Sequence, residues 1–102
     1  MDTTLILRTL VAGSLHGYGI AERLKVLSQD VLQVGESSLY PALQRLLMRG
    51  WVKAAWGASE NNRQAKFYAL TRRGRTQLRA EDQNWRRYAA AVFAALDAPA
   101  LD

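Results

Sequence analysis

The chain has 102 residues, which is the length of one domain and leaves no room for a second hydrophobic core. Its 49% apolar and 23% charged residues are typical of a folded protein, and the absence of cysteine excludes disulfides and thiolate metal sites and is compatible with a reducing compartment. Fourteen lysines and arginines against nine acidic residues give a net charge of +5, which favours a polyanionic partner, nucleic acid ahead of a membrane surface.

A short amphipathic helix is predicted at the start of the chain. We expect Thr3 or Thr4 to cap it and the glycine-serine pair at residues 13–14 to end it. Its apolar stripe consists of Leu5, Ile6, Leu10 and Val11. The glycines within residues 15–19 then predict a turn, with His16 as a turn residue.

A second amphipathic helix is predicted after this turn, ending near Ser28 or Gln29. Its apolar residues recur at i, i+4 and i+7 and are Ile20, Leu24 and Leu27. Residues 30–34 form a linker whose aliphatic side chains, Val31, Leu32 and Val34, are expected to turn inward.

Residues 35–50 predict a third helix with two different faces. The apolar face consists of Leu39, Leu43, Leu46 and Leu47. The opposite face consists of Ser38, Ala42, Arg45 and Arg49, flanked by Ser37, Tyr40 and Gln44. We expect Pro41 to place the start of the regular helix close to Ser37 or to distort it there, and Gly50 to end it. Small, hydrogen-bonding and cationic groups on one face suit a helix that enters a DNA groove, although the solvated side of an ordinary amphipathic helix has the same pattern.

The second half of the chain predicts a hairpin and a long helix. An extended run over residues 51–56, a polar loop over residues 57–64 and a returning run over residues 65–70 are typical of two paired strands. Thr71 is expected to cap the last helix, in which Gly74 is an irregularity of the first turn. A heptad-like seam predicts a dimer interface along this helix, made of Leu78, Trp85, Ala89, Val92 and Leu96. The tail after residue 97 is expected to fray.

The predicted fold is mainly α with a small β-hairpin. Residues 1–70 form a winged helix-turn-helix DNA-binding domain, and residues 71–102 form a C-terminal dimerisation helix and tail within one compact unit. An enzyme is not supported, because the chain has one histidine, no nucleophile-base pairing, no phosphate-binding glycine loop and no metal-ligand set. No cofactor or metal is predicted. Without a signal peptide or a membrane-spanning run, we expect a cytoplasmic protein with no membrane partner.

An ordered set of short motifs resembles the PadR-like family of transcriptional regulators. The set runs from His16 to about Leu96, nearly the whole chain. Its pieces are residues 16–20 (HGYGI), residues 38–43 (SLYPAL) with Leu46, residues 50–52 (GWV), residues 66–71 (KFYALT) and the Arg-Gly pair at residues 73–74. Trp51 departs from the family, which usually has a smaller aliphatic residue there. Trp51 and Trp56 are both interpreted as structural.

The resemblance implies a DNA-binding repressor that acts as a homodimer on a pseudo-palindromic operator. The third helix would enter the major groove and the tip of the wing would lie near the adjacent backbone. Leu39 would be a core residue, Tyr40 would give its hydroxyl to a phosphate, and Lys66 would contact the DNA backbone. The candidate DNA contacts, from the residues and the resemblance together, are Ser37, Ser38, Tyr40, Gln44, Arg45, Arg49, Arg63 and Lys66.

The single C-terminal helix is similar to the shorter branch of the family, in which that helix mediates dimerisation. Some of these relatives use aromatic residues at the dimer interface to contact planar ligands, so a small planar aromatic effector is a further implied partner, with Trp85 as its contact. The rival hypothesis is a winged-helix protein-interaction module without specific DNA binding, which would present the third helix to an acidic partner.

Overall fold

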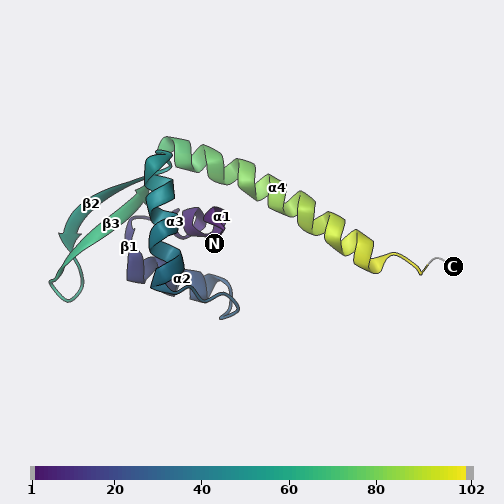
Figure 1. Ribbon diagram of the computed structural model, residues 1–102, viewed down its shortest axis with the longest axis horizontal. Coiled ribbons are helices and arrows are strands. Elements are labelled where there is room, and N and C mark those ends of the chain that lie inside the picture. The colour runs from purple at the N-terminus through teal and green to yellow at the C-terminus, as the bar shows by residue number, and fades with distance from the viewer. Residues whose placement is uncertain (1, 101–102) are drawn as a thin grey trace.

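The computed structural model describes residues 2–100, and it is mainly helical with one small antiparallel sheet. In chain order its elements are α1 (Thr3–Thr9), β1 (Leu15–His16), α2 (Gly17–Leu27), α3 (Glu36–Met48), β2 (Val52–Ala58), β3 (Gln64–Leu70) and α4 (Arg72–Asp97). Helices α2 and α3 form the helix-turn-helix, and the β2–β3 hairpin is the wing (Figure 1). The predicted fold class is therefore confirmed.

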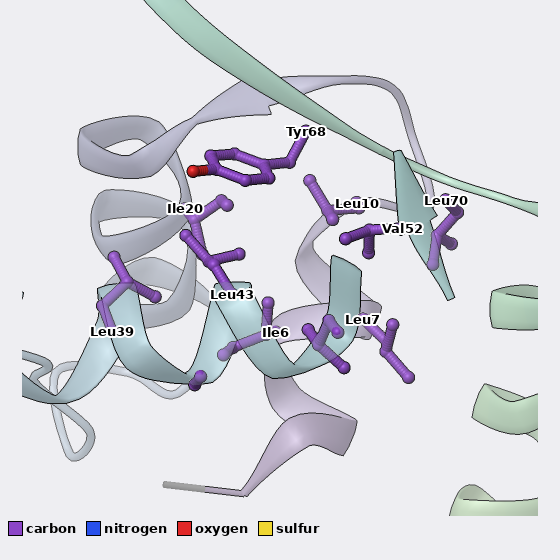
Figure 2. Close-up of a cluster of buried hydrophobic side chains, with 11 residues drawn as sticks. Ile6, Leu7, Leu10, Ile20, Leu39, Leu43, Val52, Tyr68 and Leu70 are labelled. Atoms are coloured by element: carbon purple, nitrogen blue, oxygen red, sulfur yellow. The ribbon is translucent and has the colours of Figure 1, made fainter. Parts of the chain in front are cut away.

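A core between the three short helices and the sheet holds the winged body together, by which we mean residues 2–70. Figure 2 shows side chains of α1, α2 and α3 meeting those of the strands. Ile6, Ile20 and Leu43 are fully buried there, and the ring of Tyr68 closes the cluster from the sheet. The core consists of Ile6, Leu7, Leu10, Ile20, Leu39, Ala42, Leu43, Leu46, Val52, Tyr68 and Leu70. Burial of this aliphatic surface is the main stabilising term for so small a body.

The sheet has three strands in the order β1-β3-β2, one more than the predicted hairpin. Leu15 pairs with Tyr68 and His16 with Phe67, so the segment predicted as a glycine turn is a short strand followed at once by α2. His16 is the N-cap of α2 rather than a turn residue, because its Nδ1 accepts a hydrogen bond from the Gly19 amide at 3.0 Å. The prediction failed because two residues carry too little periodicity to identify a strand.

The cap of α1 is also one residue earlier than predicted. Asp2 is the N-cap, since its carboxylate accepts from the Thr4 amide at 2.7 Å, and the helix ends at Thr9. Val11 therefore lies beyond the helix and is exposed, as is Leu27 at the end of α2. Of the linker residues, Val34 packs on the core but Val31 is 79% exposed and Leu32 is also exposed, so the inward orientation predicted for these two is wrong.

Helix α3 begins at Glu36, close to Ser37 as predicted, and continues through Pro41. Gly50 ends it as predicted. The amide of Gly50 donates to the carbonyl of Leu47 and that of Trp51 to the carbonyl of Leu46, a pattern that requires the left-handed backbone Gly50 adopts at φ +74°. Ala42, predicted on the outward face, is fully buried, because it lies one turn from Leu39 and Leu46 and its small side chain lets α3 approach the other helices.

Helix α4 starts against the winged body and then extends away from it (Figure 1). Thr71 caps it, accepting from the amide of Gly74 at 3.0 Å and donating its hydroxyl to the carbonyl of Gly50 at 2.7 Å. A Cβ on Gly74 would lie 1.9 Å from the carbonyl oxygen of Trp51, so only glycine lets the helix pack this closely. The arm gives the protein a long axis of 63 Å against 28 and 23 Å. The last two residues of the predicted tail lie outside the described residues.

Candidate nucleic-acid interface

The outward face of α3 is polar and fully accessible. Ser37, Ser38, Gln44, Arg45 and Arg49 are all exposed, as the sequence predicted, while the leucines of the same helix are turned into the core. Within residues 2–100 one ion pair forms, between Arg86 and Asp82 on α4, so the arginines of α3 have no carboxylate partner among the described residues. Donors that a fold leaves unpaired on one helix face are available to phosphates or base edges.

A hollow of about 650 Å³ separates the first half of α3 from the wing. Tyr40 borders it from α3, Tyr18 from the first turn of α2, and Arg63 and Lys66 from the wing. Lys66 is half-buried, because its stem lies along this hollow, whereas Arg63 at the wing tip is exposed. One carboxylate, Glu60, stands among these groups. The hollow thus brings together residues that are up to 52 positions apart in the sequence, and its lining is rich in aromatic and cationic side chains.

The tip of the wing is an ordered turn. The amide of Ser59 donates to the carbonyl of Arg63, and the amide of Asn62 donates to the carbonyl of Ser59, both at 2.8 Å. Asn62 adopts a positive φ of 58°, a backbone conformation that asparagine tolerates better than most residues. Arg63 is consequently held at a defined place beside the hollow.

Tyr40 is the candidate contact whose position differs most from the expectation. The side chain is 46% exposed, but its hydroxyl lies against Gly17, where an added Cβ would come within 2.6 Å of it. Burial, and then the neighbouring Tyr40, raise the pKa of Tyr68 above its ordinary value. Tyr40 and Tyr68 both border the hollow, and Tyr40 also packs α3 against the start of α2.

Arg49 is the candidate contact nearest the end of α3. Its guanidinium lies 5.0 Å from the centre of the Trp51 ring, at a distance typical of a cation–π contact. Trp51 is half-buried and packs on the core, so it is structural as predicted. Its ring is larger than the aliphatic side chain usual in the family, and it lies at the junction between α3 and β2, where it also contacts Arg49.

The sequence did not single out two aromatic residues that border the same hollow. Tyr18 is exposed, and its ring centre is 6.3 Å from that of His16. Trp56 is 70% exposed, so its interpretation as structural is wrong. Alternation along β2 puts Trp56 on the same side as Val52 and Ala54, but the core ends before it, and the ring projects into the hollow. That alternation was the signal that could have identified it.

A second hollow, of about 820 Å³, lies between α1 and α4. Its lining is mainly aliphatic and aromatic, with Leu5 and Val11 on one side and Trp85 and Ala89 on the other. Of the predicted seam, Leu78 packs on the core of its own chain, Ala89 is half-buried, and Trp85, Val92 and Leu96 are exposed. The seam thus continues from this hollow along the arm, where its apolar side chains meet solvent in the single chain.

No group of metal-ligating side chains is present within residues 2–100. None of the helices in that part of the chain is long and apolar enough to cross a membrane.

The family is decided by comparison with known sequences. The sequence model of the transcriptional regulator PadR-like family matches residues 6–80, nearly three quarters of the chain. The chain belongs to this family. Members of the PadR-like family are transcriptional regulators and not enzymes, in agreement with the sequence prediction.

Solved structures of PadR-like regulators share the whole architecture. A PadR-like transcriptional regulator from Bacillus cereus is 25% identical, with a TM-score of 0.79 over 94% of this chain and 91% of that one. A transcriptional regulator from Clostridium thermocellum is 25% identical, with a TM-score of 0.78 over 87% of this chain and 86% of that one. PadR of Bacillus subtilis, solved in complex with operator DNA, is 27% identical, with a TM-score of 0.66 over 76% of this chain but 44% of that longer one.

Proposed function

We propose that this PadR-like protein is a repressor that binds a pseudo-palindromic operator as a homodimer. The observation that carries the proposal is the juxtaposition of the exposed polar face of α3 with the cationic, aromatic hollow beside the wing. A helix face of this kind fits the major groove, and the side chains that line the hollow next to it are suited to bind the sugar-phosphate backbone. Operator binding by the Bacillus subtilis relative supports the same use of the fold.

In this docking Gln44 and Arg45 face base edges and the surrounding groups face phosphates. Gln44 and Arg45 lie in the middle of α3, where a recognition helix is deepest in the groove, and both can form bidentate hydrogen bonds with bases. Ser37, Ser38, Arg49, Arg63 and Lys66 lie around them and contact the backbone. Tyr18 and Trp56 join this second set, because they border the hollow with Lys66.

The homodimer forms through α4 and the hollow between α1 and α4. A 26-residue helix that exposes Trp85, Val92 and Leu96 has apolar surface that only a partner can cover. A second α4 lying in the hollow beside Ala89 and Val11 covers the seam of both chains through one two-fold axis. The two-fold axis then presents two copies of α3 to the two halves of the operator.

Release by a small planar aromatic effector is the regulatory part of the proposal. The supporting observation is the apolar hollow beside the indole of Trp85, whose edge also meets the ring of Tyr88 at 5.9 Å between centres. An aromatic compound stacked on Trp85 would occupy the surface on which the two arms meet. We therefore expect effector and operator to compete through the dimer rather than through α3.

The decisive experiment measures binding to a duplex containing the DNA just upstream of the coding region. Replacing Arg45 and Lys66 together by alanine is expected to weaken binding on the order of 100-fold. Lys66→Ala alone should lower the slope of log affinity against log salt by about 2, because one phosphate contact is lost in each of two protomers. Sedimentation should show that both variants remain dimers.

The matched control removes the same charge from α4, with Arg75→Ala and Arg87→Ala. Arg75 and Arg87 are exposed, and their substitution should leave affinity within a few-fold of the unmodified protein. Equal weakening by the control pair would mean that only net charge matters. Absence of duplex binding by the unmodified dimer at low salt would overturn the proposal in favour of the protein-interaction module.

A further inference from the structure

A group of half-buried and exposed polar contacts joins the start of α1 to the middle of α4. Both oxygens of the Asp2 carboxylate are used: one accepts from the Thr4 amide at 2.7 Å, and the other accepts from the indole Nε1 of Trp85 at 3.1 Å. A single carboxylate thus caps α1 and holds an aromatic side chain of α4, 83 residues away in the sequence.

Glu81, one helical turn before Trp85, adds a second link. One of its oxygens accepts from the hydroxyl of Thr3 at 3.2 Å and from the side-chain amide of Gln77 at 3.1 Å, and the other accepts from the hydroxyl of Thr4 at 2.7 Å. Glu81 is therefore bonded to the threonines of α1 and forms no ion pair with an arginine of its own helix among the described residues. The α1–α4 joint consists of Asp2, Thr3, Thr4, Gln77, Glu81 and Trp85.

The joint is the second polar attachment of α4 to the winged body, and between the two attachments the side chain of Leu78 packs on the core. The first is the start of the helix, where Thr71 and Gly74 hold it to Gly50 and Trp51. A rod fastened at one end is free to tilt, but a rod fastened at two separated points is not. Helix α4 then extends away from the body (Figure 1), and within residues 2–100 no side chain of α4 beyond Trp85 hydrogen-bonds to the body, so the joint is the last polar contact that sets its direction.

Small tilts of this arm have large effects at its far end. At about 1.5 Å per residue, the 26 residues of α4 make a rod about 39 Å long. A tilt of about 10° at its start moves the far end by roughly 7 Å, which is about twice the 3.4 Å rise of one base pair. Since the arms carry the dimer contact, the direction of α4 fixes where the two copies of α3 lie relative to each other.

We propose that Asp2 and Glu81 are positioning residues for DNA binding: through the α1–α4 joint they fix the direction of α4 and with it the half-site spacing that the dimer accepts. This inference rests on the proposed function. It assigns the two carboxylates no contact with DNA and no part in recognising bases. They act through α4, by keeping the recognition helices at one separation.

The chemistry of the joint offers conservative variants. Asp2→Asn keeps the size of the side chain but leaves one acceptor oxygen for two donors, so either the cap or the Trp85 bond is lost. Trp85→Phe removes the indole donor and leaves an aromatic ring in place. Glu81→Gln retains an acceptor, and its amide can donate to a threonine hydroxyl, so it should largely preserve the joint, whereas Glu81→Ala should break it.

The first measurement is the distance between spin labels on α3 and α4 of one chain. The chain has no cysteine, so Met48→Cys and Ala94→Cys, both at exposed positions, supply the only two labelling sites. Dilution with unlabelled chains leaves only distances within one chain, which makes the readout independent of the dimer and of DNA. We expect a narrow distance distribution for the labelled protein without further substitution. The distribution should broaden, or shift by about 5 Å or more, in Asp2→Asn, Trp85→Phe and Glu81→Ala, and stay unchanged in Glu81→Gln.

The second measurement is spacing preference. Duplexes selected from a random pool by the unmodified protein are re-spaced by adding or removing one or two base pairs at their centre. The unmodified protein should lose at least tenfold in affinity on re-spacing, and the variants that break the joint should lose less than threefold. Asp97→Asn, which neutralises an exposed carboxylate of the same helix outside both the joint and the hollow, is the control that should behave as the unmodified protein.

The outcomes separate this inference from the function on which it rests. Unchanged label distances in Asp2→Asn, Trp85→Phe and Glu81→Ala would overturn the positioning role, whatever the DNA results. Altered distances with an unaltered spacing preference would overturn the link to operator geometry. Failure of the unmodified protein to select any duplex would overturn the proposed function itself, while the label distances would still decide whether the joint directs α4.

Discussion

The winged body and the far half of α4 are both rich in apolar residues, but the body buries these side chains and the far half of α4 exposes them. In the body, Ile6, Leu43 and their neighbours are fully buried among three helices and a sheet. In the arm, Phe93 and Leu96 are exposed, Leu96 to 73%. The same aliphatic side chain therefore stabilises the chain in one region and is left facing water in the other.

The difference lies in how much apolar surface each region covers within its own chain. The body buries its core apolar residues internally, and side-chain caps close the starts of α1 and α2. The arm is a regular helix whose apolar residues share one side and exceed what its own chain covers. In the homodimer proposed above, a second chain covers this apolar side.

The largest expected effect is loss of the dimer contact along α4 while the winged body stays folded. Val92→Asp with Leu96→Asp places two carboxylates per chain on the exposed seam, where a dimer would bury them without partners. We expect sedimentation to show monomer at micromolar concentration and far-UV circular dichroism to show that the winged body is retained. Trp85 is left untouched here, because it also belongs to the α1–α4 joint.

Gln83→Asp with Ala94→Asp provides the control for this substitution. These two positions are exposed on the opposite side of α4, so the same two charges are added at equal cost in solvent. The control should remain dimeric. Dissociation by both pairs would show that charge anywhere on the helix is sufficient, and dimerisation by both would place the interface on another surface.

The next effect compares one substitution in the two regions. Leu43→Ala should lower the free energy of unfolding by about 2–5 kcal/mol, because it leaves a cavity in a fully buried site. Leu96→Ala should change the free energy of unfolding by less than about 0.5 kcal/mol. This is measured by urea denaturation at protein concentrations below the dissociation constant of the dimer, where the chain is monomeric. A loss below 1 kcal/mol for Leu43→Ala would show that the core of the body relaxes around the gap, and the contrast between the regions would disappear.

Much of the body could be predicted from the sequence, because its helices bury stripes at helical spacing and its glycines and threonines mark ends. Gly50 and Thr71 are local signals, and both act as predicted. What failed depends on partners far along the chain. Leu15 forms a strand only because Tyr68 is beside it, and Val31 is exposed because no element covers the linker residue.

In the candidate interface too, features set by local sequence could be predicted and those set by distant partners could not. The outward face of α3 could be predicted except at Ala42, since helical spacing turns its leucines into the core and leaves its polar residues outside. Trp56 and Tyr18 could not be assigned from local pattern, because their place depends on how the wing stands against α2 and α3. The α1–α4 joint joins residues about 80 positions apart, and neither Asp2 nor Glu81 carries a local signal for that contact.

The smallest expected effect lies at the boundary between the two regions. The hydroxyl of Thr71 accepts from the amide of Gly74 and donates to the carbonyl of Gly50, so it closes the end of α3 and the start of α4 at once. Thr71→Ala should cost about 1–2 kcal/mol in urea denaturation, from a lost cap and one lost hydrogen bond. Thr71→Ser keeps the hydroxyl and should cost less than half of that. If serine and alanine were equally destabilising, the methyl group of Thr71 rather than its hydroxyl would be what fastens the arm to the body.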